Sequence, residues 1–390
     1  MTGRSPIATR LAVTALVLAC GPTGPSGADA QGIHRTEHHA FTVDTVVTGL
    51  ENPWGMAFLP EGDASGAILV TERPGRLRLV RSAPGGGWTL DPQPVSGVPE
   101  VWARGQGGLL DVVLHPEFAT NRLVYLSYSK PGDGGEATTA VIRGRLEGSA
   151  LVDVEEILEA SAWRRGGAHF GSRMAFDRDG YLYVTIGDRG QMEAAQDRSN
   201  HQGVTLRLHD DGRVPDDNPF VGQSGIRPEI WTYGNRSPQG LAVHPETGEL
   251  WQTEHGPQGG DELNRLRAGA NYGWPVITYG IGYDDSVITD ETEREGMEQP
   301  VHHWVPSIAT SGLAIYDGDA FPAWRGDAFV GGLRGLVLAR VDLEGDRAVG
   351  WEPMLQSWQR IRDVRVGPEG YLYLLIDDGE APMVRLVPVD

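Results

Sequence analysis

The sequence predicts an all-β fold, a six-bladed β-propeller built from four-stranded antiparallel blades. A short phrase of small and apolar residues recurs six times along the 390 residues. Most copies are followed by a turn rich in Pro and Gly and then by a β-rich run, which is typical of a β-hairpin. Because a hairpin cannot bury its own apolar face, repeated hairpins must pack on one another, and long-period β repeats favour a propeller. The six copies begin with residues 55–58, 109–113, 173–176, 240–243, 312–315 and 362–366.

The turns and second strands of the repeats follow the same order. The runs at residues 67–71 and 181–186 illustrate the β-rich strand that is expected after a turn. The fifth copy is the poorest, because a long insertion follows residues 317–318. His115 and His244 stand directly before turn prolines, and a role within the turn suffices for both. The turn signals lie at residues 60–62, 116–117, 179–180, 245–248 and 368–370.

Length and charge limit what the chain can do. We assign residues 1–30 to a signal segment and residues 31–390 to a single propeller domain. Each repeat then has about 60 residues, more than the ~40–50 of simpler propellers, so we expect long loops of the kind on which sites are built. The formal net charge of −20 argues against nucleic-acid binding.

The N-terminus has the pattern of an export signal. Arg4 and Arg10 precede an apolar run at residues 11–19, which is too short for a membrane-spanning helix. Two processing schemes fit, either cleavage before Gln31 or a lipoprotein-type cleavage that leaves a lipid anchor on Cys20, and the mass of the mature chain separates them. Cys20 is the only cysteine, which excludes an intrachain disulfide. We expect a periplasmic or secreted protein, or a membrane-anchored lipoprotein.

A histidine and an aspartate in the third repeat are candidates for acid–base chemistry. His169 lies between glycines just before an inner strand, and Asp188 ends the paired strand, so both could lie at one end of a hairpin. A histidine titrates near neutrality and can act as a general base, and a carboxylate can orient it and stabilise its charged form. Taken alone, a loop histidine bonded to backbone is the simpler interpretation.

The fourth repeat contains a stretch rich in oxygen ligands at residues 254–264. Its glycines and proline favour irregular chain, whose free carbonyls, with carboxylates, suit calcium. An acidic surface loop is an equally good interpretation of this spacing.

Several arginines follow in the last three repeats. Arg236 opens the fourth repeat, and Arg334 lies in a glycine-rich stretch. Arg360 and Arg362 alternate with an isoleucine, which places both on one strand face. Two arginines on one face suggest an anionic ligand held by forked hydrogen bonds, although surface salt bridges, for example with Asp363, are the simpler interpretation.

Some motifs are absent from the sequence. It has no Gly-x-Gly-x-x-Gly opening a helix, no Gly-x-Ser-x-Gly elbow and no Walker-type phosphate loop. A redox enzyme with this sequence would therefore need a cofactor other than a dinucleotide bound in the Rossmann manner.

The chain resembles the soluble PQQ-dependent sugar dehydrogenases, the glucose/sorbosone dehydrogenase-like quinoprotein family, and its aldose sugar dehydrogenase branch in particular. The resemblance runs from about Val46 to Leu386 and covers most of the blades. It is carried by residues 52–55, 105–110, 169–174, 185–188, 235–240, 254–257, 261–262, 271–275 and 360–363.

The resemblance implies a propeller that holds pyrroloquinoline quinone (PQQ) and calcium. By position, His169 matches the base that takes the proton of the sugar C1 hydroxyl, Asp188 its orienting carboxylate, and Arg236 an arginine beside the reacting quinone oxygen. The remaining matches fall into three groups. Around PQQ they are Gln106, Ser237, Ser307, Arg334, Arg360 and Arg362, at the calcium beside it Gly256 and Pro257, and at a second, structural calcium Glu262 and Tyr272.

Three positions depart from the glucose-oxidising members. Ser237 stands where they have asparagine, Arg334 where they have lysine, and Ala168 where they have an acidic residue. The first two affect cofactor contacts, and the third changes the wall that faces the substrate. Compared with other members, the loops expected over the site are shorter in this sequence, which favours a broad range of aldoses.

The sequence therefore predicts an aldose dehydrogenase that oxidises the C1 hydroxyl of sugars to lactones and passes electrons to an acceptor that the sequence does not identify. Two alternatives stay open at this point. One is a non-catalytic propeller that binds a ligand or a protein, and the other is a calcium-dependent lactonase that needs no PQQ.

Overall fold

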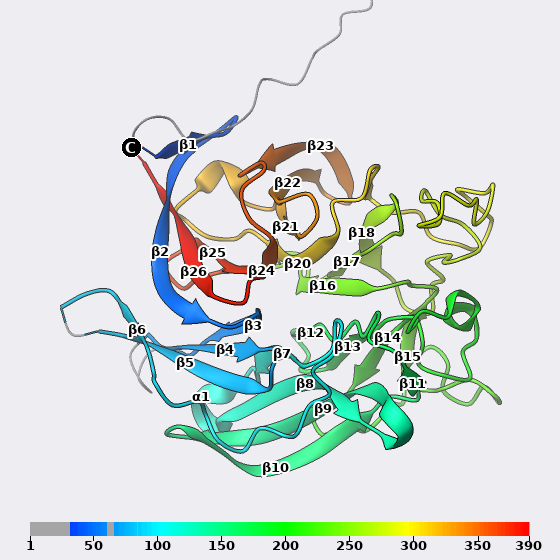
Figure 1. Cartoon of the computed structure of the whole chain (residues 1–390). Helices are drawn as coiled ribbons and strands as arrows, with labels where there is room; N and C mark the ends of the chain where they lie inside the picture. Colours follow the sequence, from blue (N-terminus) through cyan, green and yellow to red (C-terminus); the bar gives the residue numbers. More distant parts are fainter. Residues whose placement is uncertain (1–31, 61–65, 84, 390) are drawn as a thin grey trace, which may run out of the picture.

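The chain forms six small antiparallel sheets arranged around a common centre (Figure 1). The computed structural model describes residues 32–60, 66–83 and 85–389. The signal segment, Cys20 and part of the first turn lie outside these residues. The arrangement confirms the six-bladed propeller, with a fifth strand added to two of the blades.

Blades I to III follow in chain order. Blade I contains β3 (Pro53–Phe58), β4 (Ile68–Glu72), β5 (Arg76–Ser82) and β6 (Trp88–Leu90). Blade II contains β7 (Leu109–Leu114), β8 (Leu123–Pro131), β9 (Glu136–Glu147), β10 (Ala150–Glu159) and the short β11 (Arg164–Arg165). Blade III contains β12 (Met174–Phe176), β13 (Leu182–Ile186), β14 (Val204–Leu208) and β15 (Ile230–Tyr233).

Blades IV to VI complete the ring. Blade IV contains β16 (Pro238–Val243), β17 (Leu250–Glu254), β18 (Asp261–Leu266) and β19 (His302–Trp304). Blade V contains β20 (Thr310–Ile315), β21 (Ala328–Gly332), β22 (Val337–Glu344) and β23 (Arg347–Met354). Blade VI contains β24 (Ile361–Val366), β25 (Leu372–Ile376) and β26 (Ala381–Pro388), completed by β2 (Ala40–Leu50) and β1 (Ile33–Arg35).

The N-terminal strand closes the ring. Strand β2 pairs with β26, so that residues from both ends of the described chain share blade VI (Figure 1). The repeat pattern did not predict this pairing, because β2 precedes the first repeat. It leaves blade VI with its full set of strands and joins the first blade to the last.

Helical structure is minor in the described residues. It consists of α1 (Phe118–Asn121) and three 3-10 turns, Asp133–Gly135, Met192–Gln196 and Pro322–Trp324. The last of these lies in the insertion of the fifth repeat, where Phe321 and Trp324 are completely buried. The insertion therefore packs into the core. No helix in the described ranges has the length and apolar character needed to cross a membrane.

The six repeated phrases form the inner strands. Strands β3, β7, β12, β16, β20 and β24 each contact the inner strand of the next blade, and β24 contacts β3. The core lies between neighbouring blades: Leu69 and Leu79 of blade I share one cluster with Val112 and Leu126 of blade II. Burying each such side chain contributes about 1.5–3 kcal/mol, so the contacts between blades hold the ring together.

The predicted turns form as expected. At the β12–β13 turn the Asp177 carboxylate accepts hydrogen bonds from the N–H groups of Asp179 (3.0 Å) and Tyr181 (2.9 Å). His115 Nδ1 accepts from Glu117 N at 2.9 Å and His244 Nδ1 from Glu246 N at 3.2 Å. The turn role given to both histidines is therefore confirmed.

Candidate active site

The predicted site residues gather at the end of the ring where the inner strands begin. His169 precedes β12, Arg236 precedes β16, and Arg362 lies at the start of β24. Asp188 follows β13, whose end pairs with the start of β12, so the hairpin brings it beside His169. Asp188 N donates to the Arg236 carbonyl at 2.8 Å, and Arg362 Nη1 donates to Gln239 Oε1 at 2.7 Å, which shows that blades III, IV and VI meet here.

His169 and Asp188 form a close pair. His169 Nδ1 lies 2.6 Å from Asp188 Oδ1, and Asp188 is 1% exposed. Asp188 also accepts hydrogen bonds from Gly190 N at 2.7 Å and from Trp274 Nε1 at 2.8 Å. These contacts fix the carboxylate and engage one ring nitrogen, which leaves His169 Nε2 as the nitrogen that can reach a substrate.

The backbone around His169 is tightly held. His169 has a φ of 51°, and its N–H donates to Gln106 Oε1 at 2.7 Å. A Cβ at Gly187 would lie 2.3 Å from the His169 carbonyl oxygen, so only glycine allows this approach of the two strands. Gln106, which the resemblance placed beside the cofactor, therefore positions the histidine loop.

Arg236 is enclosed by aromatic rings and carbonyl groups. Its Nη1 donates to the carbonyls of His255 (3.1 Å) and Gly256 (2.9 Å), and its guanidinium lies 5.5 Å from the Trp274 ring centroid. Its Nη2 donates to the Tyr283 hydroxyl at 3.3 Å. Trp274 thus contacts both the histidine–aspartate pair and this arginine. The repeat pattern assigned no role to Trp274 or Tyr283.

Arg360 and Arg362 share one carboxylate. Their Nη2 atoms lie 2.8 Å and 3.1 Å from Asp377 Oδ2, which confirms that both point to one side of the strand. Of the acids that could have been their partner, the structure has Asp377 and not Asp363, which lies on the other face of β24 and pairs with Arg173. Burial opposes ionisation of Asp377, but the charges of Arg362 and Arg360 lower its pKa to about 2.

Arg362, Arg360 and the nearby Arg334 differ in how far their side chains are exposed to solvent. Arg362 is buried, and its Nη1 donates to Gln239 Oε1 at 2.7 Å, so it does not form a surface salt bridge. Burial lowers the pKa of its guanidinium. Arg360 Nη1 donates to the carbonyl of Leu333 at 3.3 Å, and the neighbouring Arg334 is exposed. Arg362 is therefore inside the protein, whereas Arg360 and Arg334 are exposed to solvent.

The oxygen-rich stretch is largely buried. Only residues 255–260 are irregular, since β18 begins at Asp261, and Glu254, Asp261 and Asn264 are inside the protein. The interpretation as an acidic surface loop is therefore wrong. Ser307 Oγ donates to both oxygens of Asp261 at 2.8 and 2.9 Å, and Gly256 N donates to Oδ1 at 2.9 Å.

The carboxylates of Glu254 and Glu262 lie close together, because the two residues are paired across β17 and β18. Burial raises the pKa of Glu254 to about 7. Burial and the charge of Glu254 raise the pKa of Glu262 well above its ordinary value. Asn264 Nδ2 donates to Glu254 Oε1 at 3.3 Å and to Glu262 Oε2 at 2.9 Å. A cation beside Glu262 would compensate this buried charge, as hard cations do with oxygen ligands.

The remaining oxygen ligands there would come from the backbone. The Tyr272 hydroxyl donates to the Arg265 carbonyl at 2.6 Å and accepts from Arg267 N at 3.0 Å, which leaves the main chain as the part of Tyr272 able to bind a metal. Across the described ranges, no three His, Cys, Asp or Glu side chains form a group that could hold a metal ion. A calcium site would therefore rest on carbonyls such as those of Gly256 and Pro257.

Several buried polar atoms in this region have no hydrogen-bond partner within the described part of the chain. They are Ser237 Oγ, His255 Nε2 and Arg362 Nε. Buried polar groups are almost always paired, so atoms of this kind mark a place where a polar ligand would complete the bonding. Their chemistry fits a ligand with several carboxylate or carbonyl oxygens.

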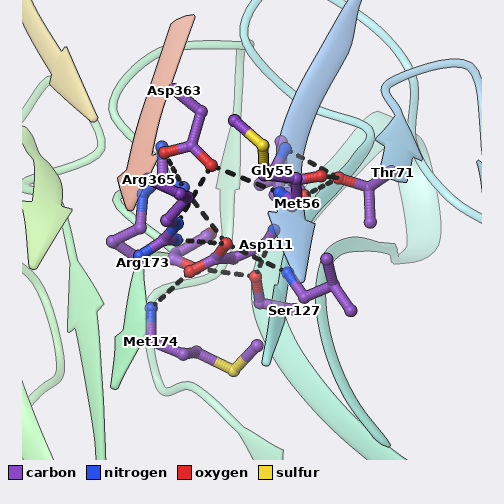
Figure 2. A network of polar contacts seen from close by, with 12 residues as sticks. Gly55, Met56, Thr71, Asp111, Ser127, Arg173, Met174, Asp363 and Arg365 are labelled. Atoms are coloured by element: carbon purple, nitrogen blue, oxygen red, sulfur yellow. Dashed lines mark hydrogen bonds and ion pairs between the residues drawn. The ribbon is translucent and has the colours of Figure 1, made fainter. Parts of the chain in front are cut away.

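An ion-pair network lies beside the site and joins four inner strands (Figure 2). Arg173 Nη1 lies 3.1 Å from Asp111 Oδ1 and 2.9 Å from Asp363 Oδ1, and all three side chains are buried. Arg365 pairs with both aspartates at 3.2 Å. The N–H of Met56 donates to Asp363, which adds β3 to the network. Sequence reasoning identified none of these residues as a unit, because they come from four repeats.

Known proteins are similar to this chain in sequence and in fold. The family model described as Glucose / Sorbosone dehydrogenase matches residues 50–385. Aldose sugar dehydrogenase YliI of Escherichia coli (strain K12) is 44% identical over 351 residues, which cover 89% of this chain and 92% of that protein.

Two solved structures extend the comparison. A crystal structure of glucose dehydrogenase has a TM-score of 0.84 and 47% identity, covering 90% of this chain and 100% of the other. The PQQ-bound form of aldose sugar dehydrogenase from Streptomyces coelicolor has a TM-score of 0.70 and 28% identity, covering 90% and 98%. The resemblance found in the sequence is confirmed, and the chain belongs to the glucose/sorbosone dehydrogenase family.

Proposed function

We propose that this protein is a PQQ- and calcium-dependent dehydrogenase that oxidises the C1 hydroxyl of aldoses to lactones. The observation that carries the proposal is the His169–Asp188 pair, which lies beside the buried Arg236 of blade IV, since Asp188 N donates to the Arg236 carbonyl at 2.8 Å. The aldose sugar dehydrogenases among the relatives, one of them bound to PQQ, support the choice of substrate class and cofactor.

His169 acts as the base. With Nδ1 bound to Asp188, Nε2 accepts the proton of the C1 hydroxyl, and the carboxylate stabilises the imidazolium that forms. Trp274 and the N–H of Gly190 hold Asp188 in position, so the imidazole keeps its orientation during the transfer. The cofactor, when bound, would be the oxidant that takes the hydride from C1.

The arginines and small polar side chains hold the cofactor. Arg334, Arg360 and Arg362 would bind its carboxylates, and Ser237 Oγ, which has no partner among the described residues, would add a hydroxyl. Arg236, enclosed by Trp274 and Tyr283, places a positive charge where negative charge develops on the oxidant. Gln106 and Ser307 act less directly, because Gln106 bonds to the backbone of His169 and Ser307 to Asp261.

Calcium would bind in two places. The carbonyl of Gly256, which lies beside Arg236, and that of the following Pro257 are suited to the ion next to the cofactor. Glu262, with the main chain of Tyr272, is suited to a second ion, since a small cavity lies between them. The raised pKa of Glu262 supports this assignment, because an adjacent cation would favour its ionised form.

The test uses purified full-length protein supplied with PQQ and calcium. We expect it to reduce an artificial dye with several aldoses, and to do nothing when either PQQ or sugar is omitted. No dye reduction with any aldose would disprove the proposal. Hydrolysis of a sugar lactone in the absence of PQQ would point to the lactonase instead.

A further inference from the structure

Exposed apolar side chains are concentrated near one edge of the site. Nine large hydrophobic side chains are exposed in the described part of the chain, and four of them lie between residues 281 and 305. They are Ile281 (41% exposed), Tyr283 (70%), Val287 (65%) and Val305 (61%), here called the rim patch. The other five lie on blades II, III and V. The long segment that carries most of the patch projects from blade IV (Figure 1, yellow).

One short loop holds the rim patch together. Gln258 N donates to the Ile281 carbonyl at 3.1 Å, and Gln258 Nε2 donates to the Gly282 carbonyl at 2.6 Å. A Cβ at Gly259 would lie 3.4 Å from the Val305 side chain, so Val305 covers the same loop. Val287 follows Ser286, whose carbonyl accepts from Gly282 N at 2.8 Å. The backbone at residues 281–282 and the Val305 side chain thus meet at residues 258–259.

The rim patch reaches the candidate active site directly. Residues 258–259 continue from Gly256, whose carbonyl accepts from Arg236 at 2.9 Å. The Tyr283 hydroxyl accepts from the same guanidinium at 3.3 Å, while its ring is 70% exposed. One side chain therefore contacts both the arginine of the site and solvent. A partner seated on the patch would lie next to the place where the oxidant is held.

Negative charge surrounds the apolar side chains. Residues 281–298 contain six exposed carboxylates but a single basic residue, Arg294, which pairs with Glu291. An apolar centre with a charged rim is the arrangement of a protein-binding surface, and the sign of the charge selects a basic partner. The exposed carboxylates are Asp284, Asp285, Asp290, Glu291, Glu293 and Glu295.

We propose that the rim patch and these carboxylates form the docking surface for a small, basic, one-electron redox protein that receives the electrons taken from the sugar. This inference rests on the proposed function. Oxidation of one C1 hydroxyl to a lactone releases two electrons and two protons. Two partner molecules, each reduced by one electron, therefore balance one turnover, and the protons leave to solvent. The acidic surround would attract the partner and speed its encounter.

The experiment compares two acceptors on the PQQ- and calcium-loaded enzyme, a small uncharged dye and a basic c-type cytochrome used as the probe. We expect the double variant Val287→Ser/Val305→Ser to lower kcat/KM for the cytochrome roughly tenfold, since a central interface contact contributes about that much. Reduction of the dye should not change. Two exposed valines on blades II and III provide the matched control, Val154→Ser/Val221→Ser, which should change neither rate.

A second set of substitutions tests the carboxylates around the rim patch. We expect Asp290→Asn/Glu293→Gln/Glu295→Gln to weaken the dependence of the cytochrome rate on salt while dye turnover stays as in the wild type. A rim-patch variant that keeps the full cytochrome rate, or that lowers both rates equally, would overturn the docking surface. A wild type that reduces the dye but not the cytochrome would also overturn it. A wild type that reduces neither acceptor with any sugar would remove the proposed function itself.

Discussion

At the residue scale, the charge balance of the site depends on Asp377. It is the carboxylate that Arg360 and Arg362 share, at 2.8 Å and 3.1 Å, and it follows the end of β25 as Asp188 follows the end of β13. In the fold it keeps the two guanidinium groups close together. A ligand carboxylate that enters beside them therefore meets a preformed pair of donors instead of two separate flexible chains.

This arrangement predicts an acid-dependent contribution to stability. The pKa of Asp377 falls from the ordinary 3.8 to about 2, so its ionised form stabilises the fold above pH 4, and the benefit is lost as pH falls toward 2. The shift corresponds to about 2 kcal/mol. Chemical unfolding of wild type and Asp377→Asn at pH 2 and pH 5 measures it. A difference between the two proteins that is the same at both pH values would contradict the assignment.

At the element scale, the inner strands combine two tasks. Their apolar positions pack against neighbouring blades, while Asp111 of β7 and Asp363 of β24 pair with Arg173 (Figure 2). Arg173 is four residues from His169, and Asp363 is next to Arg362. The network therefore connects the loop of the base to the strand of the arginine anchors. Its two buried acids and two arginines balance in charge.

Removing one member of this network leaves a buried charge without its partner. We expect Asp111→Asn to lower the free energy of unfolding by about 3–5 kcal/mol, because Arg173 and Arg365 are then left with Asp363 as the one carboxylate that they share in a dry interior. Asp44→Asn is the matched control, since its pair with Arg385 is partly exposed and should contribute less than about 1 kcal/mol. Urea titration of both variants measures the difference, and equal small losses would refute the role given to the network.

Sequence patterns predicted the inner strands better than the outer ones. The six phrases coincide with β3, β7, β12, β16, β20 and β24, because strands buried on both faces have the strongest apolar pattern. Strand β2 was missed, since its partner β26 lies at the other end of the chain and no local signal reports that pairing. Within the site, His169 and Asp188 could be found from one hairpin. Asp377 also lies across one hairpin from Arg360, but no motif singled it out. Trp274 could not be found, because it reaches Asp188 only through the packing of blade IV against blade III.

At the scale of the whole molecule, the ring gathers groups that the sequence separates widely. Gln106 comes from blade II, His169 from blade III, Arg236 from blade IV, Ser307 from the start of blade V and Arg362 from blade VI. The base and the arginine anchors are thus held by different blades. This separation means that acid–base chemistry and cofactor affinity should be separable by mutation.

The most direct test measures both properties in one pair of variants. PQQ affinity, from a titration followed by absorbance in the presence of calcium, and dye-coupled sugar turnover are compared for His169→Ala and Arg362→Ala. We expect His169→Ala to keep PQQ affinity while turnover falls roughly 10²–10⁴-fold, the usual contribution of a positioned base. Arg362→Ala should instead weaken PQQ binding. Sugar turnover that is unchanged in His169→Ala would contradict the account.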